Sequence, residues 1–489
     1  MISIPSFSDL RLRVLNSGGV NPDGGYILYW MISARRMTWN FALQRATDWA
    51  RQLGVGIVIL EPLRCDYPWA SDRLHRFVIE GMIDNAKAAT LPGVTYFPYV
   101  ELKIGNGRGL LEAVASHASL VVTDDAPHFF FPRMLQAAAE KLPIRLEAVD
   151  SNGLLPMDAA DKTYPTAYAF RRLLQKALPA FLDDRPDEAV RLAPDVTRPK
   201  IPPNVLRKWP MADLSGLLAP NGLSNLPIDH QVCPVSIRGG TVAATEQLQD
   251  FLEQQLDHYQ ELRNSPDHDA TSRLSPYLHF GHISPHQILE DLACHETWDS
   301  SRLSLETRGK KSGWWRMSPS AEAFLDELVT WRELGFNLYR HQPGPEDWTT
   351  LPEWAKNTLQ QHADDERPTV YTLEQFRDAL THDPLWNAAQ RQLLREGRIH
   401  GYLRMLWGKK ILEWSPTPRL ALEIMLELNN RYALDGRDPN STSGVTWCLG
   451  RFDRAWGPER RIFGKIRYMT SANTARKTSV TSYLERYAE

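Results

Sequence analysis

Residues 26–60 read YILYWMISARRMTWNFALQRATDWARQLGVGIVIL, and this stretch decides the fold of the first part of the chain. Two apolar runs, at 26–31 and 55–60, have the length and composition of buried strands. Between them, residues 39–54 repeat apolar side chains at helical spacing. A strand, a helix and a second strand in succession predict a parallel sheet that is covered by helices.

The same alternation continues to residue 150. Further strands are expected at 94–100, 120–125 and 144–150, and helices at 71–89, 109–117 and 133–142. No GxGxxG motif follows the first strand, and the glycines of GNGRG at 105–109 have a different spacing, so we interpret them as a turn before a helix. We therefore predict an α/β domain with a Rossmann-like parallel sheet over residues 1–180.

The rest of the chain has two further parts. Residues 181–240 contain nine prolines and little apolar periodicity, which predicts an interdomain connector. From residue 241 to residue 489 the pattern is helical almost throughout. We expect a large all-α domain there.

Composition excludes several classes of protein. With 43% hydrophobic and 24% charged residues among 489, the chain is neither disordered nor collagen-like. No apolar run reaches the roughly 18 residues of a membrane span, and we expect no signal peptide. The four cysteines form no CxxC pair or metal spacing. These features favour a protein of the reducing cytoplasm, associated with the nucleoid if the source is prokaryotic.

Tryptophan and charge are unevenly distributed. Eleven of the 16 tryptophans lie from Trp298 onward. The formal net charge is −3, but residues 391–489 carry 18 basic and 10 acidic side chains, so this end has a net charge of +8. A basic surface rich in aromatic side chains is suited to binding nucleic acid.

Hydroxyl side chains gather before a helix in TSRLSPYLHFGHIS, residues 271–284. Thr271, Ser272 and Ser275 offer hydroxyl and backbone N–H groups that can hold a phosphate. A Ser or Thr at this place more often only caps the helix, so both interpretations stay open.

Glu327 and Trp331 lie four residues apart in DELVTWREL, residues 326–334, and so share a helical face. A carboxylate beside an indole can receive a nucleobase by hydrogen bonding and stacking. An amphipathic helix with a half-buried tryptophan explains the same pattern without a site.

Three tryptophans lie within residues 383–414. Trp407 and Trp414 are seven residues apart, on one helical face and separated by roughly 10 Å along the axis, and Trp386 precedes them. Three buried indoles can relay an electron, and they can equally be core residues. Arg404 and Lys410 stand among apolar neighbours, so we expect an anionic partner for such cations.

The segment 426–469 combines a carboxylate-bearing turn with basic and aromatic residues. Asp435, Gly436 and Asp438 belong to the turn. Trp447 and Trp456 flank Arg451 and Arg454, and more cations follow. This interleaving fits phosphate contacts combined with stacking, whereas a merely solvated face would not explain the tryptophans.

These motifs together resemble the photolyase–cryptochrome flavoproteins, and specifically the class II cyclobutane pyrimidine dimer photolyases. The matching stretches are TSRLSPYLHFGHIS, ELVTWRE, HDPLWNAAQ, GRIHGYLRMLWGKKILEW, LNNRYALDGRDPN and DRAWGPERRIFGKIRYM. The resemblance is strongest over residues 241–477. It implies an antenna-type α/β domain and a helical domain that binds FAD.

The resemblance also implies roles for individual residues. FAD phosphates and ribose would be held by Tyr259, Thr271, Ser272, Arg273, Leu274 and Ser275. The flavin would be lined by Arg332, Arg404, Asn429, Asp435, Gly436 and Asp438, with Asn429 near its N5 atom. Photoreduction would use Trp386, Trp407 and Trp414. The dimer pocket would be formed by Glu327, Trp331, Met405 and Trp447, and Arg454 and Trp456 would contact DNA.

The implied activity is a light-driven carbon–carbon lyase that acts on damaged DNA as a monomer. Reduced, anionic FAD would pass an electron to a flipped-out dimer, which is the kind of base extrusion that photolyases perform. A second, light-harvesting chromophore of the deazaflavin type would fit the α/β domain. Arg273 departs from the asparagine more usual in class II members.

Two other functions stay open at this stage. One is a cryptochrome-like signalling flavoprotein, although such proteins often have a long C-terminal extension and only twelve residues follow Lys477. The other is a DNA-binding homologue without repair activity. It is motivated by two segments of the first domain that depart from the usual class II pattern, EPLRCDYPWASDRLHRF at 61–77 and VVTDDAPHFFFPRM at 121–134.

Overall fold

The computed structural model describes residues 6–489, which form two compact units interleaved along the chain. The first unit contains the residues up to 160 with 177–249 and 274–300. The second contains residues 161–176, 250–273 and 301–489. The division of the chain into three domains, with boundaries at residues 180 and 240, stays a prediction.

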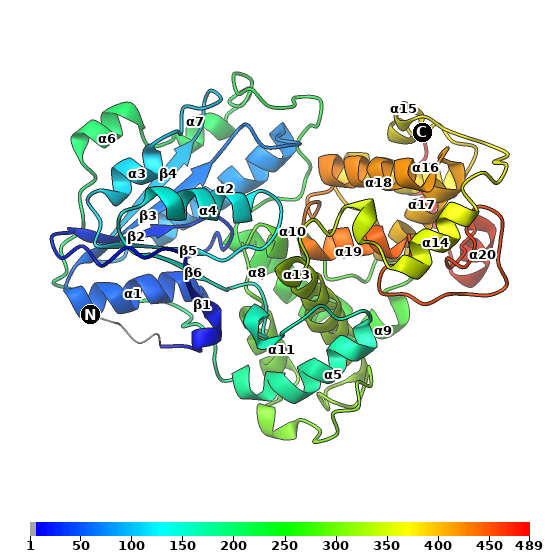
Figure 1. Cartoon of the computed structure of the whole chain (residues 1–489), viewed down its shortest axis with the longest axis horizontal. Coiled ribbons are helices and arrows are strands. Elements are labelled where there is room, and N and C mark those ends of the chain that lie inside the picture. Colours follow the sequence, from blue (N-terminus) through cyan, green and yellow to red (C-terminus); the bar gives the residue numbers. More distant parts are fainter. Residues whose placement is uncertain (1–5) are drawn as a thin grey trace. The chain divides into compact units, whose positions relative to one another are not determined.

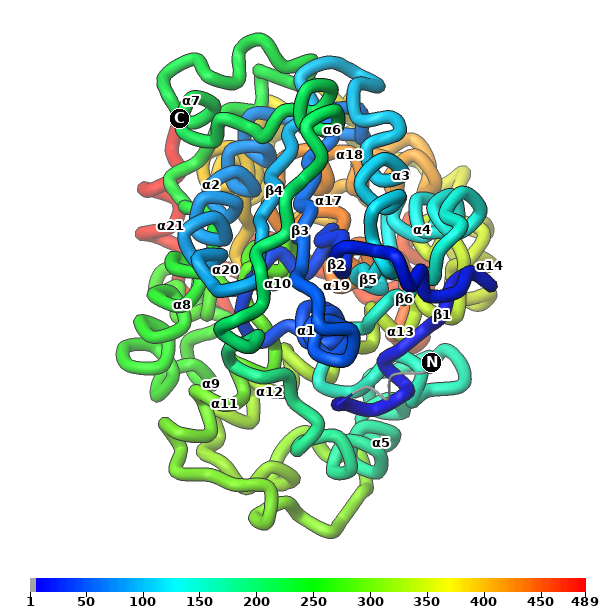
Figure 2. Tube along the Cα trace, turned by 90° about the vertical axis from the view of Figure 1, so that its left-hand side faces the viewer, coloured from blue at the N-terminus to red at the C-terminus, as the bar shows by residue number. Residues whose placement is uncertain are grey.

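The first unit is built on a six-stranded sheet. Its strands are β1 (Leu12–Val14), β2 (Tyr26–Trp30), β3 (Gly56–Leu63), β4 (Val94–Val100), β5 (Leu120–Asp124) and β6 (Leu146–Val149). The order is β1-β6-β5-β2-β3-β4, and Figure 2 shows the strands following one another in this order. All neighbours are parallel except β1 and β6, which confirms the predicted α/β fold. Strand β1 was not predicted, because three residues on a sheet edge give no detectable period.

Helices cover both faces of this sheet. The four helices between the strands are α1 (Phe41–Leu53), α2 (Asp72–Ala88), α3 (Leu110–Ala115) and α4 (Phe131–Lys141). Along β2, Leu28 packs in the cluster that contains α3 and α4, whereas Ile27 packs against α1. Figure 1 shows α1 on one side of the strands and α3 and α4 on the other. The alternation of strand side chains therefore builds two cores.

The backbone N–H groups that follow strand β2 bind the side chain of Asp124, which lies at the end of the neighbouring strand β5. Asp124, at the end of β5, accepts hydrogen bonds from the backbone N–H groups of Ile32, Ser33 and Ala34 at 2.7–3.0 Å. Successive N–H groups after a strand form a nest for an anion, and here that anion is Asp124. The GNGRG segment is the turn before α3 that we expected, with Gly109 in the left-handed region as its N-cap.

The remaining helices of the first unit follow the sheet. They are α6 (Pro203–Lys208), α7 (Leu214–Leu218), α8 (Thr241–Asp250), α10 (Ser275–His279) and α11 (Pro285–His295). The two short helices α6 and α7 lie within the proline-rich stretch 181–240.

The second unit is helical, as predicted. Its helices are α5 (Ala167–Ala177), α9 (Tyr259–Leu262), α12 (Pro319–Leu325), α13 (Arg332–His341), α14 (Glu353–Gln361), α15 (Leu373–Arg377), α16 (Pro384–Glu396), α17 (Gly401–Trp414), α18 (Pro418–Tyr432), α19 (Pro439–Trp447), α20 (Ser471–Lys477) and α21 (Thr481–Arg486). A π-helical stretch, Asp326–Trp331, lies between α12 and α13. Within residues 6–489 no helix is long and apolar enough to cross a bilayer.

Candidate active site

Three buried indoles form a continuous contact chain in the second unit. Trp386 on α16 is 6.5 Å from Trp407 on α17, with the rings nearly parallel, and 6.0 Å from Trp414 at an angle of 69°. Trp386 therefore lies between the other two. Its Nε1 donates to the carbonyl of Trp407 at 3.0 Å, and Trp407 Nε1 donates to Gln390 at 2.9 Å. The structure thus brings together the three tryptophans that the sequence analysis singled out.

Glu327 and Trp331 occupy the π-helical stretch Asp326–Trp331, where both side chains are partly exposed. Such local widening of a helix is frequent at functional sites. Arg263 donates to Glu327 Oε1 at 2.8 Å, and the two side chains are 28% and 43% exposed. Exposed ion pairs contribute about 0–1 kcal/mol, so Glu327 can exchange this partner for a base edge at little cost.

The other two residues of the expected dimer pocket lie on neighbouring helices. Met405 is on α17 and Trp447 is the last residue of α19. Both α17 and α13, the continuation of the π-helical stretch, pack against α19. The four expected pocket residues therefore come from the π-helical stretch, from α17 and from α19.

Cations surround the tryptophans at the basic end. The Arg467 guanidinium lies 5.0 Å from the Trp447 ring and 4.1 Å from the Trp456 ring, so it joins the two indoles. Asp453 holds Arg467 through two hydrogen bonds and also accepts from Trp456 Nε1 at 3.1 Å. Exposed Arg454 lies 4.6 Å from the Trp456 ring. Burial raises the pKa of Asp453, but its bond to Arg467 reverses the shift and keeps that pKa below its usual range.

The predicted flavin-lining residues form local pairs. Arg404 binds Asp435 at 3.1 Å, which supplies the anionic partner expected for this cation. Buried Asn429 shares hydrogen bonds of 3.0 and 3.3 Å with Ser441. Asp438 caps α19 by accepting from Asn440.

Two further residues of this group are fixed by packing. Gly436 lies against its own turn, where an added Cβ would come within 2.7 Å of the Asn429 carbonyl. The guanidinium of buried Arg332 lies 4.6 Å from the Phe336 ring.

The expected phosphate segment divides between the units. Asp269 accepts from Thr271 and Arg273 and is paired with Arg398 at 2.6 Å. Burial opposes ionisation of Asp269, but Arg398 outweighs it and lowers the pKa to about 2. Ser272 belongs to the same unit, whereas Leu274 and Ser275 belong to the first unit, at the start of α10. Tyr259 is buried against Phe251 and Phe324.

Comparison with known proteins gives the family. No protein-family model matches the chain. It is 34% identical over 480 residues to a deoxyribodipyrimidine photo-lyase from Methanothermobacter thermautotrophicus, with 97% of both chains covered. The chain belongs to the deoxyribodipyrimidine photo-lyase family. Relatives of the same name from Arabidopsis thaliana and Potorous tridactylus are each 32% identical, covering 99% and 98% of this chain and 94% and 84% of their own lengths.

A solved structure of the family agrees in fold. The crystal structure of a bacterial class III photolyase from Agrobacterium tumefaciens matches with a TM-score of 0.64 and 16% identity, covering 96% of this chain and 87% of the other. The expected fold class and membership of the photolyase family are thus confirmed, whereas the assignment to class II stays a prediction. The individual site residues stay predictions within this family.

Sequence reasoning missed one buried histidine of the second unit. His400, at the N-cap of α17, is 2% exposed, and neither ring nitrogen has a hydrogen-bond partner within residues 6–489. Burial lowers its pKa to about 4, so the ring is neutral and offers one donor and one acceptor. The sequence feature that could have indicated His400 is its position at the start of a buried helix, between Arg398 and Arg404.

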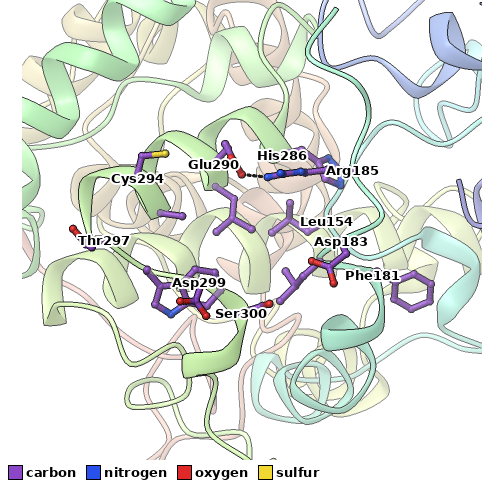
Figure 3. Close-up of a pocket in the computed structure, with 14 residues that line it drawn as sticks. Leu154, Phe181, Asp183, Arg185, His286, Glu290, Cys294, Thr297, Asp299 and Ser300 are labelled. Carbon is purple, nitrogen blue, oxygen red and sulfur yellow. Dashed lines mark hydrogen bonds and ion pairs between the residues drawn. The ribbon is translucent and has the colours of Figure 1, made fainter. Parts of the chain in front are cut away.

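A cavity of about 590 Å³ lies in the first unit and contains none of the predicted site residues. It lies between α11, Leu154 and the segment 181–185, and an ion pair joins Arg185 to Glu290 on its wall (Figure 3). The residues expected to act in this family are therefore separate from this cavity.

Proposed function

We propose that this protein is a light-driven DNA repair enzyme of the class II type, which splits cyclobutane pyrimidine dimers. The contact chain of Trp386, Trp407 and Trp414 carries the proposal. All three indoles are at most 4% exposed and neighbouring ring centroids are 6.0–6.5 Å apart. Such an arrangement suits electron transfer between a buried cofactor and the outside.

FAD is the cofactor that the residues of the second unit fit. Arg273 and Arg398 share the single carboxylate of Asp269, so this cluster would retain positive charge for an anionic group, and Asn429 supplies a buried amide. The two unpartnered ring nitrogens of buried His400 support a polar ligand there, because such atoms are costly to leave without a partner. When bound and reduced, FAD would supply the photoexcited electron that opens the dimer and would take it back.

The chain's own residues would hold the lesion. Trp331, Trp447 and Met405 provide aromatic and thioether surface for a bulky, nearly apolar dimer. Glu327 would accept a hydrogen bond from a base edge after leaving Arg263. The damaged pair costs least to open, which would select it over normal pairs.

Damaged DNA is the proposed partner, and the basic end is its proposed contact. Arg454, Arg467 and Trp456 join charge and stacking surface, as binding of an opened strand requires. We propose a monomer that works in the cytoplasm, at the nucleoid in a prokaryote. A deazaflavin-type second chromophore in the α/β domain stays a prediction. The signalling alternative is not favoured, since the relatives named above are photo-lyases.

The test is a direct repair assay. Protein reduced with dithionite is mixed with an oligonucleotide that carries one thymine dimer, and dimers are counted after blue light and after darkness. We expect loss of dimers only in the light. Equal dimer counts in both samples would contradict the proposal, and an absorption spectrum of the same preparation shows whether flavin and a second chromophore are present.

A further inference from the structure

Two consecutive lysines of α17 lie in different surroundings. Lys410 Nζ is 2.7 Å from Glu413 Oε2 and lies 5.1 Å from the Trp414 ring. Lys409 is completely buried, and no carboxylate of residues 6–489 forms an ion pair with it. Its Nζ instead donates to the backbone carbonyl of Cys448 at 2.7 Å.

Lys409 also contacts an indole of the expected dimer pocket. Its Nζ lies 5.2 Å from the centre of the Trp447 ring. The Arg467 guanidinium lies 5.0 Å from the same ring, so two cations contact one indole. A desolvated cation over an indole binds it more strongly than a cation at an exposed site does.

Backbone geometry explains why the lysine reaches this place. Trp447 ends α19 and Cys448 is its C-cap, so the ammonium binds a carbonyl at the negative end of a helix. The neighbouring Gly408 allows the close approach of α17, since an added Cβ would come within 2.5 Å of Cys448 Sγ. Lys409 thereby fixes the turn that carries Trp447.

Burying an ammonium without a carboxylate is costly, and a methylene side chain would fill the space without this cost. This cost is reflected in a lowered pKa of the Lys409 ammonium group. Burial lowers the pKa of Lys409 to about 8, with Arg467 acting in the same direction and Cys448 and Asp453 opposing it. A residue that serves packing alone does not need this charge.

We propose that protonated Lys409 is a positioning residue of the dimer pocket, which holds the Trp447 indole through the Cys448 carbonyl and through its charge over the ring. This inference rests on the proposed function. Lys409 would help to recognise the lesion, whereas Lys410 would not. Neither lysine would contact the reacting atoms.

The proposal predicts a pH dependence of recognition with a definite sign. Lys409 is charged below its pKa of about 8 and loses the charge above it. The other titratable and charged groups around Lys409 are Cys448, Asp453 and Arg467. Burial raises the pKa of Cys448 to about 11, and the pKa of Asp453 is lowered, so neither group changes its charge between about pH 6.5 and about pH 9.5. Preference for dimer-containing DNA should therefore fall as pH rises through about 8.

The experiment measures dark equilibrium binding of the full-length protein to one oligonucleotide with and without a thymine dimer, from about pH 6.5 to about pH 9.5. The ratio of the two affinities should fall about thirtyfold across this window, the scale of one desolvated cation–π contact. Lys409→Met should have the low ratio at every pH, and Lys409→Arg should keep a ratio that does not change with pH. Lys410→Met, the matched control on the same helix, should keep the wild-type ratio and its pH dependence.

Circular dichroism and thermal unfolding identify any variant that fails to fold, and the pH series on the unaltered protein does not depend on a variant. A wild-type ratio that is constant with pH, or a folded Lys409→Met protein with the wild-type ratio, would overturn the role of Lys409. Failure of the unaltered protein to repair dimers in light would instead overturn the proposed function.

Discussion

Two groups of tryptophans in the same helical unit have opposite surroundings. Trp386, Trp407 and Trp414 are buried, and Trp386 contacts each of the other two. Trp386 donates to a carbonyl and Trp407 to an amide. Trp447 and Trp456 are partly exposed and lie beside cations. Positive charge makes an indole harder to oxidise, because it disfavours the radical cation. The first group is therefore suited to moving electrons and the second to holding bases and phosphates.

Trp414 lies at the border between the two kinds of surroundings. Lys410 is 5.1 Å from its ring, but Glu413 neutralises this charge at 2.7 Å. The positive charge beside Trp414 is thus neutralised, as the proposed electron relay through this indole requires. Lys409, only one residue earlier, has no such partner and contacts Trp447.

The largest effect is expected on photoreduction when Trp386, the middle indole of the contact chain that we propose as an electron relay, is replaced. Trp386→Phe removes an indole that contacts both other members, so photoreduction of oxidised flavin should slow by about a hundredfold, or about 2.7 kcal/mol in barrier. The variant also loses its hydrogen bond to Trp407, so thermal unfolding should be measured beside the flash-induced absorption change. Photoreduction at the wild-type rate in a folded variant would contradict the relay.

Replacing the partly exposed Trp447 should weaken DNA binding and leave photoreduction of the flavin intact. Trp447→Ala should weaken binding to dimer-containing DNA by about 1–3 kcal/mol, the value of one lost stack. Fluorescence anisotropy with damaged and undamaged strands measures this difference. An equal loss on both strands would show that Trp447 does not recognise the lesion.

Much of this division could be predicted from the sequence, because periodicity reports which residues share a face. The seven-residue spacing of Trp407 and Trp414 placed them on one side of α17. That Trp386 lies between them depends on how α16 packs against α17, which no local pattern contains. For the same reason the sequence could not tell Lys409 from Lys410, nor find Arg263, which reaches Glu327 from 64 residues away in the chain.

The fold shows the same limit. The strands β2 to β6 were predicted because each is a compact apolar run, whereas β1 has three residues and was missed. The π-helical turn that carries Glu327 and Trp331 follows an ordinary helical pattern in sequence. Its widening depends on the contacts of the folded unit.

A third test uses the close contact between α17, which carries Trp407 and Trp414, and the end of α19, which carries Trp447. Gly408→Ala places a Cβ within 2.5 Å of Cys448 Sγ, so α17 and the end of α19 must separate slightly. We expect a loss of about 1–3 kcal/mol in the free energy of unfolding, as for overpacking in a core. Dimer affinity should fall with it, while photoreduction by the folded protein should be retained. An unchanged unfolding midpoint would show that the contact is not tight.

The smallest effect is expected for Arg454, an exposed cation at the basic end of the chain. Arg454→Ala should weaken binding to damaged and undamaged strands alike and reduce the salt dependence of log K by about 0.9, one phosphate contact. Titrations at several salt concentrations measure the slope. A loss confined to the damaged strand would place Arg454 in the dimer pocket instead.

The division between the two groups is tested most directly by repair with a broken relay. Trp414→Phe protein, reduced chemically with dithionite so that it needs no photoreduction, is given dimer-containing DNA under blue light. Our account predicts the wild-type repair rate, together with slow photoreduction of the same protein when it starts oxidised. Repair that slows in proportion to photoreduction would contradict the account, because the relay and the lesion pocket would then not be separate devices.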